Sequence, residues 1–164
     1  MAEAPSVPRL HAALRRAQAS VGVAESVTAG LLAAAFTETP GASRTFRGGV
    51  VVYATDLKSS LGGVPERLLA AHGPVSAEVA AALADGVRAR LAVTYGLAVT
   101  GVAGPDPQGP EPVGTVYVAV AGPGVAEVRR IAVPGDLAAV RAGAVRAALG
   151  LLAEVLPAGE VSLG

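Results

Sequence analysis

Three segments of the chain follow a predicted strand and bring residue types that could do chemistry. The first covers residues 26–30, where Ser26 lies in a tight turn between a strand and a helix. Its hydroxyl would be exposed, and the backbone amides that follow could hold a phosphate or an oxyanion. The simpler explanation is that Ser26 or Thr28 only caps the helix, and this segment taken alone favours that explanation.

The second segment carries Lys58, the only lysine among thirteen basic residues. Lysine can lose its proton where its surroundings demand it, whereas arginine effectively cannot. We expect Lys58 in the first turn of a helix after Tyr53, where the helix dipole disfavours a cation by ~0.3–1 kcal/mol. A lysine pKa near 10.4 must fall by ~3 units, or about 4 kcal/mol, before the neutral amine prevails at pH 7. Burial would have to supply most of that shift. The alternative is that Lys58 is an ordinary solvated lysine on the surface. A genome-wide preference for arginine codons would then explain why it is the only lysine.

The third segment covers residues 100–105, in which Gly101 and Gly104 follow a strand. Glycines let the backbone approach a ligand closely and expose several amides. A plain loop is the simpler explanation of this segment alone. Together the three segments combine a serine, a lysine and a tyrosine with anion-binding amides. This combination indicates a metal-free serine amidase or esterase that uses a lysine base.

The composition excludes several other kinds of site. The chain has no cysteine, and His11 and His72 lie far apart, which argues against a metal site and against a Ser-His-Asp triad. The formal net charge is zero and the basic residues do not cluster, so no nucleic-acid partner is expected. No apolar run reaches the ~20 residues of a membrane span, and the first residues lack the pattern of a signal peptide, so export is not expected. We therefore expect a cytoplasmic protein with no membrane partner, no metal and no organic cofactor.

Strands and helices alternate along the chain, which is typical of a layered α/β protein. Thr55 or Asp56 is expected to cap the short helix with Lys58, and Ser76 and Asp136 are expected to cap two longer helices. Strands are predicted over 20–24, 48–53, 95–100, 115–121 and 125–133, and the longer helices over 10–19, 31–36, 65–71, 76–91 and 137–156.

The last two predicted strands form a hairpin, which indicates a mixed sheet. We therefore expect a three-layer α/β/α sandwich around a mixed, mostly parallel sheet. No linker or repeat interrupts the elements, so one domain is expected over residues 9–156. Flexible tails are expected at residues 1–8 and 157–164.

Short motifs in a fixed order resemble the CinA C-terminal domain family, whose stand-alone members are nicotinamide-nucleotide amidases. The ordered set covers the chain from about residue 8 to 156 and is specific as a whole. The motifs are Ala24-Glu25-Ser26-x-Thr28-x-Gly30, Phe46-x-x-Gly49 through Tyr53 to Lys58, Gly73-Pro74-Val75-Ser76, Gly101-Val102-Ala103-Gly104-Pro105-Asp106, Pro112-Val113-Gly114-Thr115-Val116 and Gly135-Asp136.

The resemblance implies hydrolysis of nicotinamide mononucleotide to nicotinate mononucleotide and ammonia in pyridine-nucleotide salvage. It implies that Ser26 is the nucleophile and that Lys58 and Tyr53 activate it. The expected substrate contacts are Thr28, Ala29, Gly30, Thr100, Gly101, Gly104 and Arg141.

The chain departs from the family pattern at three positions and in one loop. Val27 replaces a common cysteine, Ala29 replaces a glycine, and Leu137 stands where an arginine usually follows the Gly-Asp pair. If that arginine holds the substrate phosphate or carboxamide, this chain needs Arg141 one turn later in its place or loses affinity for the substrate. The loop over residues 106–111 is short and rich in proline.

Three alternatives to this amidase stay open. The chain could be a nucleotide-binding module that has lost catalysis, or a protein-interaction domain linked to competence or DNA damage. It could also be an amidase for another small amide. An Ala/Val-rich helix on the surface favours a homo-oligomer, most simply a dimer.

Overall fold

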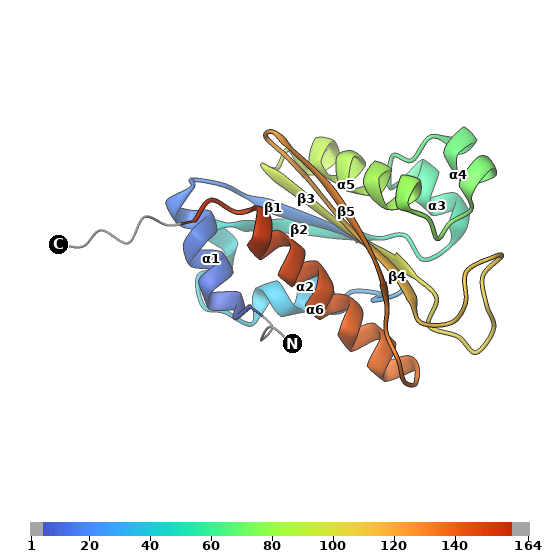
Figure 1. Ribbon diagram of the computed structural model, residues 1–164. Helices are drawn as coiled ribbons and strands as arrows, with labels where there is room; N and C mark the ends of the chain where they lie inside the picture. The colour runs from blue at the N-terminus through green and yellow to red at the C-terminus, as the bar shows by residue number, and fades with distance from the viewer. Residues whose placement is uncertain (1–4, 159–164) are drawn as a thin grey trace.

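A five-stranded sheet with helices on both faces forms the protein, which we describe from a computed structural model for residues 5–158 (Figure 1). The strands are β1 (Val21–Glu25), β2 (Phe46–Val51), β3 (Tyr95–Gly101), β4 (Thr115–Gly122) and β5 (Val125–Ala132). The helices are α1 (Val7–Arg16), α2 (Leu31–Thr37), α3 (Thr55–Ser60), α4 (Glu66–His72), α5 (Ala77–Leu91) and α6 (Leu137–Val155), with a 3₁₀ turn η1 at Ala42–Arg44. The predicted α/β/α sandwich is confirmed.

The strand order β2-β1-β3-β4-β5 divides the sheet into a parallel and an antiparallel part. Strands β2, β1 and β3 are parallel, whereas β4 and β5 are antiparallel to their neighbours, so the sheet is mixed as predicted. The carboxyl ends of β1, β2 and β3 therefore lie at one edge. All three segments with candidate chemistry follow these strands, so the topology brings them to the same edge.

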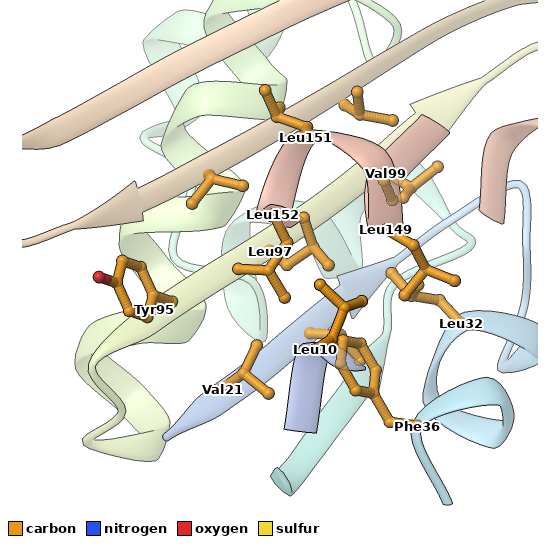
Figure 2. Packing of buried hydrophobic residues seen from close by; sticks show 14 of the residues in the cluster. Leu10, Val21, Leu32, Phe36, Tyr95, Leu97, Val99, Leu149, Leu151 and Leu152 are labelled. Atoms are coloured by element: carbon orange, nitrogen blue, oxygen red, sulfur yellow. The ribbon is translucent and has the colours of Figure 1, made fainter. Parts of the chain in front are cut away.

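The two faces of the sheet carry side chains of different size. Valine and leucine side chains such as Val21 and Leu97 pack with Leu152 on the face covered by α1, α2 and α6 (Figure 2). The next residues along the same strands face α5 and include Ala24 and Ala98. Successive residues of a strand point to opposite faces of the sheet. The alternation therefore gives a core of large side chains on one face and lets α5 pack closely on the other.

Glycines let α5 approach both the sheet and the turn after α3. A Cβ on Gly96 of β3 would collide with the carbonyl oxygen of Ala84 in α5. A Cβ on Gly86 of α5 would likewise collide with the carbonyl oxygen of Gly62. This contact holds the turn that follows α3, the helix of Lys58, against α5.

The ends of the longer helices follow the predicted capping pattern, with one difference. Ser76 and Asp136 each accept a hydrogen bond from an amide in the first turn of α5 and α6, as predicted. Helix α1 begins at Val7, before the predicted start at residue 10, because Pro8 is compatible with the first turn of a helix. Residues 1–4 and 159–164 of the expected tails lie outside the described residues. Within residues 5–158, no helix is both long enough and apolar enough to cross a membrane.

The short helix α3 corrects two sequence-based expectations. Neither Thr55 nor Asp56 caps it, because both lie inside the helix and Ala54 occupies the N-cap position. Lys58 lies in the last turn of α3 rather than the first. The helix dipole therefore does not disfavour its charge, and any change in its pKa must have another cause.

Candidate active site

Lys58 and Ser26 meet at the edge where the parallel strands end. The Lys58 Nζ donates hydrogen bonds to the Ser26 Oγ at 3.0 Å and to the carbonyl oxygens of Val52 at 2.8 Å and Tyr53 at 3.2 Å. The lysine is only 2% exposed. Burial lowers the pKa of Lys58 from 10.5 to about 8. At pH 7 about a tenth of the lysine side chains would therefore be neutral, and the neutral form prevails above pH 8.

The surroundings of the amine favour the loss of its proton. Within residues 5–158 no carboxylate forms an ion pair with Lys58, so a positive charge there has only neutral oxygens as partners. A neutral amine keeps two N–H groups, which match the two carbonyl oxygens of Val52 and Tyr53. Its lone pair is then left to accept the proton of the Ser26 hydroxyl. The three contacts thus suit a lysine that acts as a base toward this serine.

The turn that carries Ser26 is held by the sheet and by the residue before it. The Ser26 amide donates to the Val99 carbonyl at 3.0 Å, which continues the pairing of β1 with β3. The carboxylate of Glu25 is 1% exposed and accepts three hydrogen bonds. The donors are the Thr28 hydroxyl at 2.6 Å and the amides of Leu32 at 2.8 Å and Ala33 at 3.0 Å. Glu25 therefore ties the end of β1 to the start of α2 on both sides of Ser26.

We predict that Glu25→Gln lowers the free energy of unfolding by about 1–3 kcal/mol. The glutamine amide nitrogen replaces one acceptor, so one of the three buried donors loses its partner. Urea denaturation followed by circular dichroism measures the change. The exposed Glu38, which follows the same helix, supplies the control: Glu38→Gln is expected to leave the stability unchanged. Equal stabilities for both variants would show that the Glu25 carboxylate does not hold the turn.

A cavity of about 170 Å³ opens over Ser26 and Lys58. It brings together residues from all three segments of the sequence analysis with the Pro74-Val75 turn before α5. The lining residues are Ser26, Val27, Tyr53, Thr55, Lys58, Pro74, Val75, Gly101, Val102, Ala103, Gly104, Asp106 and Gln108. Five of the expected site residues, Ser26, Lys58, Tyr53, Gly101 and Gly104, therefore line one cavity.

Tyr53 contributes its ring and its main chain in different ways. Its carbonyl oxygen accepts from Lys58, whereas its side chain is 68% exposed. Within residues 5–158, the Tyr53 hydroxyl makes no hydrogen bond with Ser26 or Lys58. The tyrosine is thus placed to contact a ligand in the cavity, and the serine and lysine interact without its hydroxyl.

The other expected contact residues support the walls and do not line the cavity. The Thr100 hydroxyl donates to the Pro74 carbonyl at 2.8 Å, and the Arg141 Nη2 donates to the Thr28 carbonyl at 3.2 Å. Ala29 and Gly30 have φ angles of 47° and 105° and shape the turn into α2. An alanine at the first of these left-handed positions carries backbone strain that a glycine would avoid.

Sequence reasoning missed Glu25 as a support and Asp106 and Gln108 as lining residues. Glu25 and Asp106 appear in the motifs but were given no role. An acidic residue that ends a strand just before a helix start is a signal for the capping role of Glu25. Asp106 has no comparable local signal, because only the folded loop brings it to the cavity.

Comparisons with known proteins agree with this architecture. Residues 4–156 match the protein family described as CinA C-terminal domain. A CinA-like protein from Frankia casuarinae is 54% identical over 84% of this chain and 32% of its own length. A CinA-like protein from Myxococcus xanthus is 53% identical over 78% of this chain and 31% of its own length. The chain thus spans about a third of the length of these curated relatives.

Solved structures with similar folds cover nearly the whole chain. A competence-damaged protein (CinA) superfamily protein from Escherichia coli matches with a TM-score of 0.88 and 30% identity, over 92% of this chain and 88% of that one. The corresponding protein from Klebsiella pneumoniae 700603 matches with a TM-score of 0.88 and 32% identity, over 92% of this chain and 94% of that one. The family match over residues 4–156 includes every residue that lines the cavity.

Proposed function

Because the chain belongs to the family of CinA C-terminal domains, we propose that its cavity hydrolyses the carboxamide of nicotinamide mononucleotide to nicotinate mononucleotide and ammonia. The observation that carries this proposal is the 3.0 Å contact between Ser26 and a buried lysine that has no carboxylate partner among residues 5–158. This pair suits acyl transfer by a serine nucleophile and needs no metal ion. The reaction would serve pyridine-nucleotide salvage.

The first half of the proposed reaction transfers the acyl group to Ser26. Neutral Lys58 takes the hydroxyl proton as the serine oxygen bonds to the amide carbon, which gives a tetrahedral intermediate with a negative oxygen. Collapse of the intermediate breaks the carbon–nitrogen bond, and protonated Lys58 gives its proton to the departing nitrogen, so that ammonia leaves. The products of this half are ammonia and an ester of Ser26.

The second half repeats the proton transfers with water. Lys58 takes a proton from water as the water oxygen attacks the ester carbon, and it returns that proton to the Ser26 oxygen when the ester bond breaks. Amides of the lining residues Val27, Ala103 and Gly104 would face the negative oxygen of each intermediate, because the Ser26 and Val102 amides already donate to the carbonyls of Val99 and Thr115. The Ala29 amide is less suited, because it already donates to the Ser26 carbonyl at 3.0 Å. Tyr53 would contact the substrate ring or donate a hydrogen bond to it.

Ammonia release from nicotinamide mononucleotide tests the proposal directly. We expect the purified protein to release one ammonia for each nicotinate mononucleotide formed. We also expect the rate to be unchanged after dialysis against a metal chelator. Nicotinamide, nicotinamide riboside and an aliphatic amide complete the panel, and heat-denatured protein is the control. No ammonia from nicotinamide mononucleotide would contradict the proposed substrate, whereas ammonia from another amide alone would indicate a different amidase.

The pattern of binding and turnover separates the remaining alternatives. A module that has lost catalysis would bind the nucleotide in calorimetry without releasing ammonia. A protein-interaction domain would show neither binding nor turnover. Leu137 is exposed, and Arg141 donates a hydrogen bond to the Thr28 carbonyl and does not line the cavity, so we assign the phosphate contact to neither residue.

A further inference from the structure

The charges around the cavity are unevenly distributed. Among the lining residues of the described chain, Lys58 is the only basic group and Asp106 the only acidic one. Lys58 is buried at 2% exposure, whereas Asp106 is exposed on the loop between β3 and β4. When Lys58 is neutral, as the proposed mechanism requires, the Asp106 carboxylate is the only full charge on the lining. The cavity then favours a positively charged ligand.

The loop that carries Asp106 is fastened to the sheet. Gln108 and Glu111 exchange two backbone hydrogen bonds of 3.0 Å, which close the loop on itself. The Glu111 carboxylate then accepts hydrogen bonds from the Tyr117 hydroxyl at 3.0 Å and from Arg130 at 3.1 Å. Both partners lie on neighbouring strands, β4 and β5. Asp106 is therefore presented by a loop with fixed anchors.

We infer that Asp106 is a specificity-determining residue, which selects amides whose aromatic ring carries a positive charge, as in an N-substituted pyridinium. This inference deepens the proposed function, on which it rests for the choice of substrate. The carboxamide of such a ring would face Ser26, and the ring would lie between Asp106 and the largely exposed ring of Tyr53. A cation over an aromatic face is stabilised by the ring quadrupole, and a nearby carboxylate adds to that attraction.

The same arrangement places the substrate phosphate away from the cavity. A phosphate beside Asp106 would meet a like charge, and no arginine lines the cavity among residues 5–158. The ring charge is therefore the feature that this cavity recognises, and the phosphate would point outward from its mouth. Nicotinamide mononucleotide and its reduced form separate the two contributions, because both carry the phosphate but only the oxidised ring is charged.

Equilibrium binding of these two nucleotides tests the inference. The Ser26→Ala protein is used so that no turnover occurs, and calorimetry at about pH 9, above the Lys58 pKa of about 8, compares it with the double variant Ser26→Ala/Asp106→Asn. We expect Asp106→Asn to weaken binding of the oxidised nucleotide about fivefold and to leave the reduced nucleotide nearly unchanged. The difference should shrink in 0.5 M salt, because mobile ions screen an exposed charge. Asp85→Asn removes an exposed carboxylate of α5 outside the cavity and should change neither affinity.

An equal loss of affinity for both nucleotides would overturn the inference, and so would an absence of binding to the Ser26→Ala protein. The ammonia assay tests the proposed reaction separately, and its result does not depend on this binding experiment. If it is negative while Asp106→Asn still weakens only the charged ligand, the proposed reaction is wrong and the inference about ring charge stands.

Discussion

Replacing Ser26 by alanine is expected to lower the rate of ammonia release from nicotinamide mononucleotide by at least about 10⁴-fold. The Ser26 oxygen is the only hydroxyl within residues 5–158 that hydrogen-bonds to Lys58. Without it no acyl-enzyme forms, and losses of about 10⁴ to 10⁶ in kcat are typical when the nucleophile of such a pair is removed. Steady-state ammonia release at saturating substrate measures the change.

Thr55 provides a matched control for this prediction. It is a second hydroxyl residue that lines the same cavity, but it makes no hydrogen bond with Lys58 in the part of the chain that the structure describes. Thr55→Ala is expected to keep kcat within about threefold of the unmodified protein, because it leaves the hydrogen bonds of Lys58 to Ser26, Val52 and Tyr53 in place. If Thr55→Ala were as inactive as Ser26→Ala, or if Ser26→Ala stayed active, the assignment of the nucleophile would be wrong.

The α/β/α sandwich and the proximity of Ser26 to Lys58 were both predicted from the sequence, because both follow from the local patterns of strands and helices. Alternation of strands and helices determines the sandwich, and parallel strands bring their carboxyl ends to one edge. A lone lysine after one strand and a serine after another were therefore expected near each other. The hydrogen bonds of Lys58 to the Val52 and Tyr53 carbonyls were not predictable, since they depend on how α3 turns back over the end of β2.

The hydrogen bonds that support the cavity walls could not be predicted from local sequence patterns either. Thr100 and Arg141 were expected at the ligand, but they bind carbonyl oxygens of the walls, Pro74 and Thr28. A hydroxyl or a guanidinium can donate a hydrogen bond to a carbonyl of the cavity wall or to a ligand, and only the distances in the folded protein decide between the two. Asp106 lies far along the chain from Ser26, and a loop anchored through Glu111 brings it to the cavity.

Activity is expected to depend on a neutral Lys58, which makes both the pH profile and the substitutions informative. With a Lys58 pKa of about 8, kcat/KM should rise about tenfold per pH unit below pH 8 and level off above it. Lys58→Arg and Lys58→Met should each lower kcat/KM by about 10³-fold or more, because neither side chain accepts a proton. An active Lys58→Arg variant would reduce the lysine to an electrostatic role.

The stability of the protein offers a test of the same pKa without any substrate. Burial lowers the Lys58 pKa from 10.5 to about 8, so between these values the unfolded chain binds more protons than the folded one. The contribution of Lys58 to the free energy of unfolding should therefore rise with pH from about 8 to 10.5 and stay constant below 8. Lys58→Met lacks this titration, so the difference in unfolding free energy between the two proteins isolates it. A difference that does not change with pH in this range would mean that Lys58 keeps its ordinary pKa, and the lysine could then not serve as the base at neutral pH.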